Sequence, residues 1–475
     1  MAQKRQAFPW KTFLKQVAVI AVPVALQNLL TTTGSMVDTM MLAPLGSLTV
    51  GAVGLCAQFS SLVFSGYWGF AGGGMLFFSQ YFGAKDDDGI RRAYGITLIC
   101  MMTVATLFAV AALFFPEVIM GIYTDKESIQ ALGIQYLKIV GFAYPFQVYS
   151  MAMSALLRTT DHVRIPLYGS IVSVATNIVL NWILIGGHLG APALGIQGAA
   201  IATVCSAIVN ALVILVAARI VRHPHLFRIR AHYRWTRRFL KEYFRKCAPI
   251  LANEIAMGVG FMLINVVLGR QSEEAIAATA VFRTLEGLVI GFFTGFSNAA
   301  SILIGQEVGA GHPDMAQKRA KRLVYLCAGL IFTVCAMLVG ANNLILRMMS
   351  LEGESLRLGA GMLMIYAVAA AVRMSNWVQN DTFRAAGDAA FGTILEITFM
   401  FLMVLPCVYF TGMVKHAPFL IVFACCYIDE PVRFALMHGH LYSLKWIKPV
   451  TPQGQAALAE FNANRKKKQR GEESC

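Results

Sequence analysis

The sequence predicts an all-α integral membrane protein with twelve transmembrane helices in two pseudo-symmetric six-helix lobes. Three observations lead to this prediction: the apolar composition, the recurrence of apolar stretches of helix length, and an internal duplication. Of the 475 residues, 57% are hydrophobic and only 14% are charged, and the mean hydropathy is +0.61. Soluble globular domains of this length are much more polar than this chain.

Apolar stretches close to the ~20 residues that cross a bilayer recur along the whole chain. Lipid-exposed backbone must satisfy its own hydrogen bonds, and the stretches lack the short alternating pattern of barrel strands, so each one is predicted to be a helix. The first stretch is too long for a signal peptide and lacks its small-residue cleavage site, which favours a retained helix. The twelve predicted spans are residues 14–38, 49–80, 93–115, 132–156, 166–186, 197–219, 247–269, 276–305, 320–342, 360–381, 391–411 and 417–440.

Lysine and arginine are concentrated in alternate connections between the predicted helices. The loops 43–48 and 186–195 contain neither residue, whereas the segment 219–246 is strongly basic and the formal net charge is +15. The positive-inside rule therefore predicts a multi-pass protein with both termini and the central linker in the cytoplasm. The basic linker is interpreted as a topology determinant on anionic lipid headgroups, and a regulatory or nucleic-acid role is the less favoured alternative.

The second half of the chain repeats the first at a constant offset of 226 residues. Pro23 falls on Pro249, and the loop 79–84 falls on 305–310 with its Gln, Gly and Ala preserved. Six helices per half require parallel repeats, which enclose a central cavity in transporters of this design. The predicted segments are an N-terminal lobe (1–222), a linker (223–246), a C-terminal lobe (247–448) and a cytoplasmic tail (449–475).

The sequence contains none of the common signatures of an enzyme or an ATP-driven pump. It has no GxxxxGK[ST] phosphate-binding loop, no HExxH motif and no CxxC pair among its ten cysteines,. We therefore expect no catalytic residues, no metal site and no cofactor. The energy for transport is then predicted to come from an ion gradient.

Several motifs, in a common order and spacing, carry a resemblance to a known family. They include Pro23 with Gln27 and Asn28, Val37–Met40, Ser79–Ala84, Gly195–Ala200, Pro249–Glu254, Thr284–Glu286 and Arg384–Asp388. In these motifs the chain resembles the multidrug and toxic compound extrusion (MATE) transporters from about residue 10 to 448. The resemblance implies two six-helix lobes and export of small molecules coupled to an ion.

Asp38 is the leading candidate for ion coupling, since a charged side chain in a hydrocarbon span costs about 2.5–3.5 kcal/mol. The resemblance implies that Asp38, Asn177, Asn181 and Thr203 form a cluster that takes up a proton or sodium ion and changes the bend of the first helix at Pro23. Asn181 is neutral where many relatives have an acid. The alternative is that Asp38 merely caps or anchors the helix at the membrane surface.

The predicted C-terminal lobe is richer in charge than the N-terminal lobe. The candidates for a substrate- or cation-binding site are Glu254, Arg283, Glu286, Asn298 and Arg373. In one interpretation Glu254, one turn beyond the helix kink expected at Pro249, and Glu286 attract a cation. In the other, the same charges form a structural ion-pair network between helices. Possible cavity-lining residues are Gln58, Tyr67 and Tyr366.

These features predict a secondary antiporter that exports amphipathic, cationic small molecules in exchange for H⁺ or Na⁺. The expected partners are an organic substrate and membrane lipids, with no nucleic acid, and the expected state is a monomer. A flippase for a lipid-linked precursor is the alternative, but it favours an arginine-lined cavity. A membrane enzyme would need a cluster of His or acids at one interface, and none is visible in the sequence.

Overall fold

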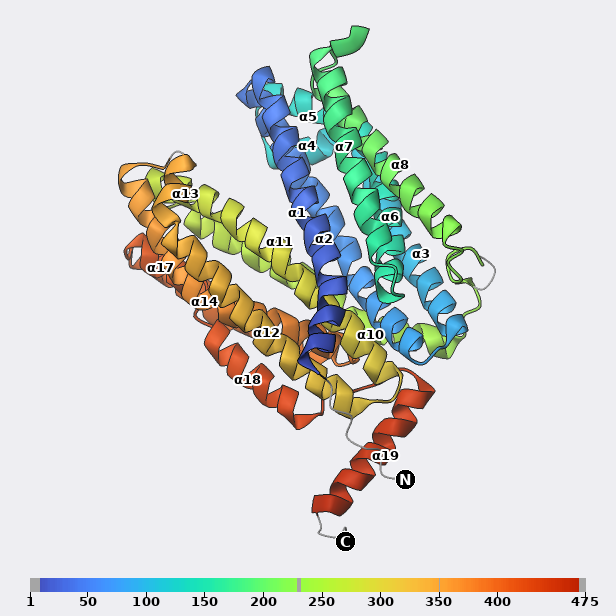
Figure 1. Cartoon of the computed structure of the whole chain (residues 1–475). Coiled ribbons are helices and arrows are strands. Elements are labelled where there is room, and N and C mark those ends of the chain that lie inside the picture. Colours follow the sequence, from blue (N-terminus) through green and yellow to red (C-terminus); the bar gives the residue numbers. More distant parts are fainter. Residues whose placement is uncertain (1–8, 229–231, 350, 470–475) are drawn as a thin grey trace. The chain divides into compact units, whose positions relative to one another are not determined.

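The structure is a computed structural model that describes residues 9–228, 232–349 and 351–469. Within these ranges the chain is almost entirely helical and contains no β-strand (Figure 1). This agrees with the composition, because helices satisfy their backbone hydrogen bonds without help from water. The chain divides into two compact units.

The first unit, called the N-terminal unit, consists of Leu26–Phe78 and Asp87–Cys247. Its helices, some of which extend beyond it, are α1 (Trp10–Leu42), α2 (Ser47–Gly83), α3 (Asp87–Phe114), α4 (Pro116–Tyr123), α5 (Glu127–Val140), α6 (Ala143–Thr159), α7 (Arg164–Gly186), α8 (Ile196–Ile220) and α10 (Arg237–Leu268). The helices α7 and α8 pack along each other, and α6 packs against α3 and α8.

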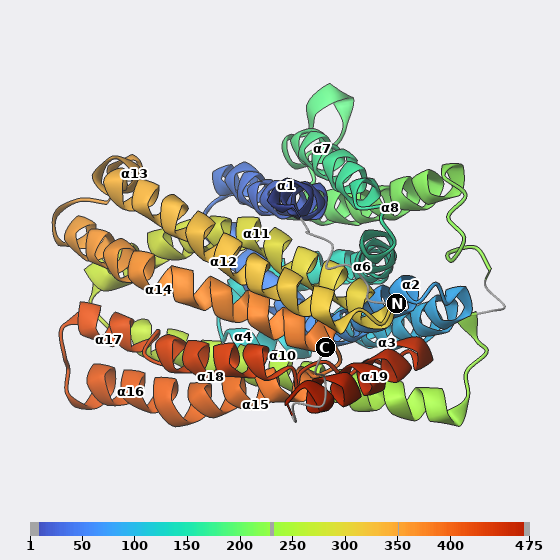
Figure 2. The same ribbon diagram turned by 60° about the horizontal axis from the view of Figure 1, so that its bottom comes forward.

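The second unit, called the C-terminal unit, consists of Met1–Ala25, Ser79–Asp86 and Ala248–Cys475. Besides parts of α1, α2 and α10, its helices are α11 (Glu273–Gly309), α12 (Pro313–Gly340), α13 (Asn342–Met348), α14 (Gly353–Ala385), α15 (Ala389–Phe399), α16 (Leu405–Tyr409), α17 (Phe419–Cys425), α18 (Glu430–Ser443) and α19 (Pro452–Gln469). The helices α11, α12 and α14 pack against one another, and α12 and α14 run side by side in Figure 2.

Two of the four divisions between the units fall beside a proline inside a long helix. The boundary in α1 lies after Ala25, two residues past Pro23, and the boundary in α10 lies after Cys247, two residues before Pro249. A proline removes one helical N–H donor, so each helix lacks a backbone hydrogen bond close to the boundary. Both helices nevertheless continue through the proline without a break.

Ten described helices are long and apolar enough to cross a membrane. The predicted span 132–156 is instead two helices, α5 and α6, which meet at a bend of 50° and together make an eleventh candidate. The predicted span 417–440 contains α17 and α18, separated by residues 426–429. The predicted span 391–411 contains two π-helical stretches, Met400–Val404 and Phe410–Val414. Hydropathy locates these spans but carries no signal for the breaks inside them.

Local signals explain where several helices begin. Ser272 caps α11 by accepting a hydrogen bond from the backbone N–H of Ala275 at 3.2 Å. Proline occupies the first position of α4, α12 and α19, where the missing N–H costs nothing and the fixed φ suits a helix,.

Candidate functional site

Asp38 and Asn181 lie in direct contact in the N-terminal unit. The Asn181 amide donates to Asp38 Oδ1 at 2.5 Å and to Asn177 Oδ1 at 3.2 Å. Asn181 is fully buried, Asp38 and Asn177 are half-buried, and Asn181 Oδ1 has no hydrogen-bond partner among the described residues. The cluster therefore offers a carboxylate and two amide oxygens at one place, with an unused buried acceptor.

Thr203 and Tyr136 complete this cluster, and Tyr136 was not a candidate from the sequence. The Tyr136 hydroxyl shares a hydrogen bond with the Thr203 side chain, and Tyr136 lies close enough to Asp38 for electrostatic interaction. Thr203 also donates to the backbone oxygen of Ala199 at 3.0 Å. A tyrosine in an apolar helix carries no sequence signal of such a role.

A second polar group lies in the N-terminal unit, in the part of α1 that follows Pro23. Gln27 donates to the hydroxyl of Ser170 at 2.9 Å and accepts from Arg158 at 2.6 Å. Arg158 is only 4% exposed. The sequence indicated Gln27 as a motif residue but not that it would meet Arg158, because 131 residues separate them.

In the C-terminal unit, Glu286 is held by two arginines. Arg283 and Arg373 each donate to one of its carboxylate oxygens at 2.6 Å, and the Tyr427 hydroxyl donates to the same carboxylate at 3.3 Å. Glu286 is 3% exposed. A buried carboxylate with two guanidinium partners is already compensated, so a further cation would gain little from it.

Arg384 lies among three carboxylates of the same unit. Its guanidinium is 3.3 Å from Glu254, 3.7 Å from Asp381 and 3.8 Å from Glu396. Asp381 also accepts a hydrogen bond from the Ser297 hydroxyl. One positive charge therefore faces three acids here, of which Asp381 was not recognised in the sequence.

Arg433 links this group to the remaining charges. It binds Glu396 at 2.8 Å and Asp429 at 3.1 Å, and Glu430 lies 3.9 Å away. Glu430 in turn lies 3.8 Å from Arg373. The result is a continuous chain of alternating charges that runs from Glu254 to Arg283 through α10, α11, α14, α15 and α18.

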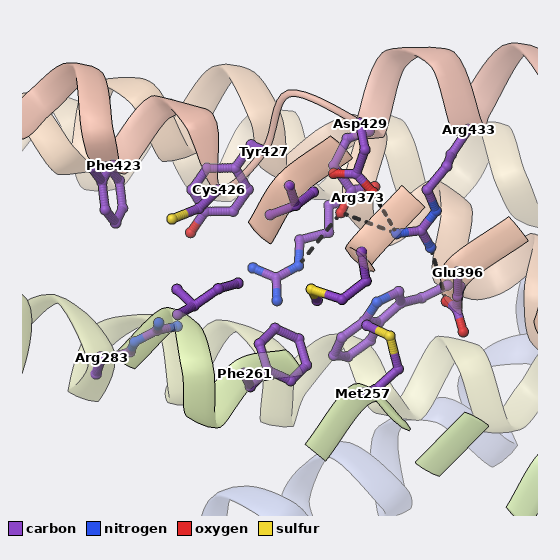
Figure 3. Close-up of a pocket in the computed structure, with 15 residues that line it drawn as sticks. Met257, Phe261, Arg283, Arg373, Glu396, Phe423, Cys426, Tyr427, Asp429 and Arg433 are labelled. Atoms are coloured by element: carbon purple, nitrogen blue, oxygen red, sulfur yellow. Dashed lines mark hydrogen bonds and ion pairs between the residues drawn. The ribbon is translucent and has the colours of Figure 1, made fainter. Parts of the chain in front are cut away.

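Part of this charge chain lines a small cavity in the C-terminal unit (Figure 3). The Arg373 guanidinium lies in its middle, with Tyr427 on one side and Phe261 on the other. The cavity volume is about 40 Å³, enough for a few water molecules. Pockets for drug-sized ligands measure about 300–1,000 Å³, so the cavity in this conformation suits water or an ion.

The other predicted site residues do not line this cavity. Tyr366 is buried and packs edge-on against Phe282 at 5.3 Å, and the Asn298 amide donates to the backbone oxygen of Thr294 at 2.9 Å. Gln58 is exposed and Tyr67 is buried in the N-terminal unit. Their role as cavity-lining residues stays a prediction. No group of three or more His, Cys, Asp or Glu suited to a metal ion occurs in the described part of the chain.

Both halves of the chain match one known protein family. The MatE family model matches residues 23–183 and 249–410, one match for each half of the chain. The chain belongs to the MATE family of transporters. Membership confirms the predicted family and makes the chain a multi-pass membrane transporter rather than an enzyme.

Two curated relatives are named as probable multidrug resistance proteins. "Probable multidrug resistance protein YoeA" of Bacillus subtilis is 26% identical over 389 residues, which cover 81% of this chain and 83% of the relative. "Probable multidrug resistance protein NorM" of Rhizobium meliloti is 26% identical over 326 residues, covering 68% of this MATE chain and 69% of the relative.

Solved structures of MATE transporters share the fold. An outward-facing multidrug resistance MATE family transporter superposes with a TM-score of 0.81 at 18% identity, covering 91% of this chain and 96% of the other. A transporter of the same superfamily from Pyrococcus furiosus also has a TM-score of 0.81, at 17% identity over 91% and 96% of the two chains. The predicted twelve helices in two lobes are confirmed by this likeness.

Proposed function

We propose that this MATE transporter is a secondary antiporter that exports amphipathic, cationic small molecules in exchange for H⁺ or Na⁺ by alternating access. The observation that carries the proposal is the Asp38 cluster. Asp38 has no lysine, arginine or histidine within ion-pair distance among the described residues, so its charge is free to be neutralised by a coupling ion. An uncompensated acid at membrane depth is the usual mark of an ion pathway.

The geometry of the cluster suits either coupling ion. A protonated Asp38 gains an O–H donor, and the unpaired Oδ1 of Asn181 supplies an acceptor nearby,. A sodium ion would find the hard oxygen ligands of Asp38, Asn177, Asn181 and Thr203. Either ion changes the charge on α1, the helix that contains Pro23, and the ion gradient can thereby favour one shape of this helix.

Acidic side chains of the C-terminal unit are the candidates for attracting a cationic substrate. Glu254 and Asp381 are half-buried and share Arg384 with Glu396, so the acids around this arginine outnumber it. Glu286, the other acid predicted for this site, is compensated by two arginines. We therefore assign the cation preference mainly to Glu254 and Asp381, and we assign Glu286 to the ion-pair network.

The alternative function, a flippase for a lipid-linked precursor, needs arginines that are available to bind an anionic group. Arg373, Arg384 and Arg433 each have at least two carboxylates within 4 Å. Cation export therefore fits the charges better than transport of a pyrophosphate. Of the arginines in the charge chain, Arg283 is the most exposed, and it donates to Glu286 and Asn265.

The proposed orientation places both termini and the basic linker in the cytoplasm of a bacterial inner membrane, with a monomer as the transporting species. Cysteine substitutions at Leu189 and Lys415, which are both exposed, should react with an impermeant reagent from outside intact cells. His232 is only 4% exposed, so Tyr233, at 55%, is the better linker probe and should stay unlabelled. Labelling of Tyr233→Cys from outside would show that the orientation is opposite to the one proposed.

The direct test of the function uses purified protein in liposomes. A fluorescent organic cation should accumulate against its gradient when a proton gradient or, in a separate experiment, a sodium gradient is imposed, and the effective ion identifies the coupling. Flux that ignores both gradients would contradict antiport. Transport of a lipid-linked anion instead of the dye would favour the flippase.

A further inference from the structure

Two equivalent helix ends cross at close range within the C-terminal unit. The last turn of α2 (79–83) packs on the end of α11, and the two segments are related by the 226-residue offset of the duplication. A Cβ atom added at Gly83 would overlap the backbone oxygen of Gln306, and one added at Gly309 would overlap that of Gln80. Each repeat thus places a glycine against the glutamine of the other, and only glycine permits this approach.

Gln80 joins three segments at this crossing. Its side-chain amide donates to the backbone oxygen of Ala385 at the end of α14, at 2.7 Å. Its side-chain oxygen accepts from the backbone N–H of Val450, in the segment before α19, at 2.8 Å. Gln80 is completely buried, so breaking these bonds would leave buried polar groups unpaired.

The segment 446–454, called the strap, closes over the crossing. Thr451 is fully buried and donates to the backbone oxygen of Gly309 at 2.9 Å, and it accepts from the N–H of Gly454 at 3.1 Å. The Lys448 ammonium donates to Asp388 at 2.7 Å, and its backbone N–H donates to Ala386 at 2.9 Å. The strap is therefore anchored to α11 and to the turn after α14.

We propose that the strap is a latch that holds the α2–α11 crossing closed, and that Gln80 and Thr451 are positioning residues of the transport cycle. The inference rests on the proposed alternating access. Residues 79–86 are grouped with α11, whereas the rest of α2 belongs to the N-terminal unit. A movement of α2 that withdraws residues 79–83 from α11 would break the bonds of Gln80 and expose the Thr451–Gly309 contact.

The test compares Thr451→Val and Gln80→Leu with a control, Gln455→Ala, whose exposed side chain donates to the backbone oxygen of Pro449 at 3.2 Å. Both substitutions keep the approximate size of the side chain but remove hydrogen bonds. In the full-length protein, amide hydrogen exchange in residues 79–86 and 446–454 should accelerate about tenfold relative to the control. Exchange elsewhere and the melting temperature should stay near the wild-type values.

Transport kinetics give the second readout. A weaker latch increases the fraction of molecules that are open on the side of the strap. The apparent KM for an organic cation offered from that side should therefore fall. The ion preference should stay unchanged, because the substitutions leave the coupling site unmodified. Wild-type exchange in residues 79–86 for Thr451→Val would overturn the latch, even if Gln80→Leu does not fold. Faster exchange spread over α11 and α14, with a lower melting temperature and unchanged KM, would also overturn it, because that result indicates a purely structural contact. Failure of the wild type to transport would reject the proposed function but would leave the exchange result to be judged separately.

Discussion

Equivalent positions in the two halves of the chain form polar groups with different charges and different contacts. In the N-terminal unit, Gln27 bridges Ser170 and Arg158 through neutral and charge-assisted hydrogen bonds. The only ionic group of this trio is the arginine, so the trio has no carboxylate whose charge an ion could neutralise.

The offset of 226 residues places Asn253, Glu396 and Arg384 at the corresponding positions of the C-terminal unit. Asn253 donates to Glu396 at 2.7 Å, and Arg384 lies 3.8 Å from the same carboxylate. The serine of one half is thus a glutamate in the other. An amide and an arginine are present at the equivalent positions of both halves, and only the second half adds a carboxylate, which belongs to the charge chain.

At the candidate coupling site, the acid is in the first half of the chain and not in the second. Asp38 corresponds to Ile264 at this offset, and Asn181 corresponds to Cys407, so the cluster around Asp38 exists only in the N-terminal unit. An acid without a basic partner can change its charge at moderate cost, whereas acids within an arginine network resist such a change. We infer that ion coupling belongs to the first half and cargo attraction to the second.

Asp38→Asn should have the largest effect and should abolish gradient-driven export. Asparagine keeps the size and hydrogen bonding of the side chain but cannot gain and lose a charge. Liposome uptake of a fluorescent cation measures the loss, and melting temperature and membrane insertion should match wild type. Undiminished export would remove Asp38 from the coupling role and leave it as a helix anchor.

Arg433→Met should destabilise the C-terminal unit by about 3–5 kcal/mol, because it leaves buried Glu396 and Asp429 without their shared partner,. The melting temperature in detergent should fall markedly. Arg357→Met is the matched control, since the side chains of Arg357 and Glu354 are 80% and 53% exposed and their pair should contribute almost nothing,. Equal melting temperatures for the two variants would contradict a structural charge chain.

Glu254→Gln should weaken binding of an organic cation about tenfold, equivalent to ~1.4 kcal/mol, and should affect a neutral compound of similar shape less. Glu286→Gln should weaken cation binding by a smaller factor and lower the melting temperature more, because it leaves Arg283 and Arg373 short of a partner. Binding of the matched ligand pair at constant pH and salt measures both. Equal losses for both ligands in Glu254→Gln would place Glu254 in the structural network as well.

The smallest expected effect is that of pH on the docking of the linker in the N-terminal unit. Burial lowers the pKa of His223 to about 3 and that of His225 to about 4, with the neighbouring histidines contributing in the same direction. Asp87, 3.8 Å from His225, opposes this shift, and Arg91 adds to it. The folded linker thus prefers neutral imidazoles.

Because the unfolded pKa of histidine is about 6.5, the stabilisation of the docked linker by neutral His223 and His225 is complete above that pH. It is lost as the pH falls toward the folded pKa values of about 4 for His225 and about 3 for His223. Trp235, whose indole donates to the backbone oxygen of Arg92 at 3.0 Å, reports docking through its fluorescence. Its emission should shift on acidification in wild type and shift less in His225→Gln. A pH-independent emission in wild type would contradict this account of the linker.

The sequence predicted the helices, the duplication and the acids, but not how the polar residues meet. Asp38 and Asn181 are 143 residues apart, and Gln80 meets Ala385 across 305 residues. Periodicity and hydropathy describe one helix at a time, so they carry no information on such pairs. Tyr136 and Asp381 were missed because neither belongs to a motif, although the offset that aligns the repeats could have led to the Asn253–Glu396–Arg384 group.

The division of roles is tested most directly by infrared difference spectra of the purified protein on addition of protons or sodium ions. The account predicts a change in carboxyl or carboxylate stretching bands that is present in wild type and in Glu254→Gln and absent in Asp38→Asn. A wild-type difference spectrum in Asp38→Asn, with the change lost in Glu254→Gln, would contradict it and would move ion coupling to the C-terminal unit.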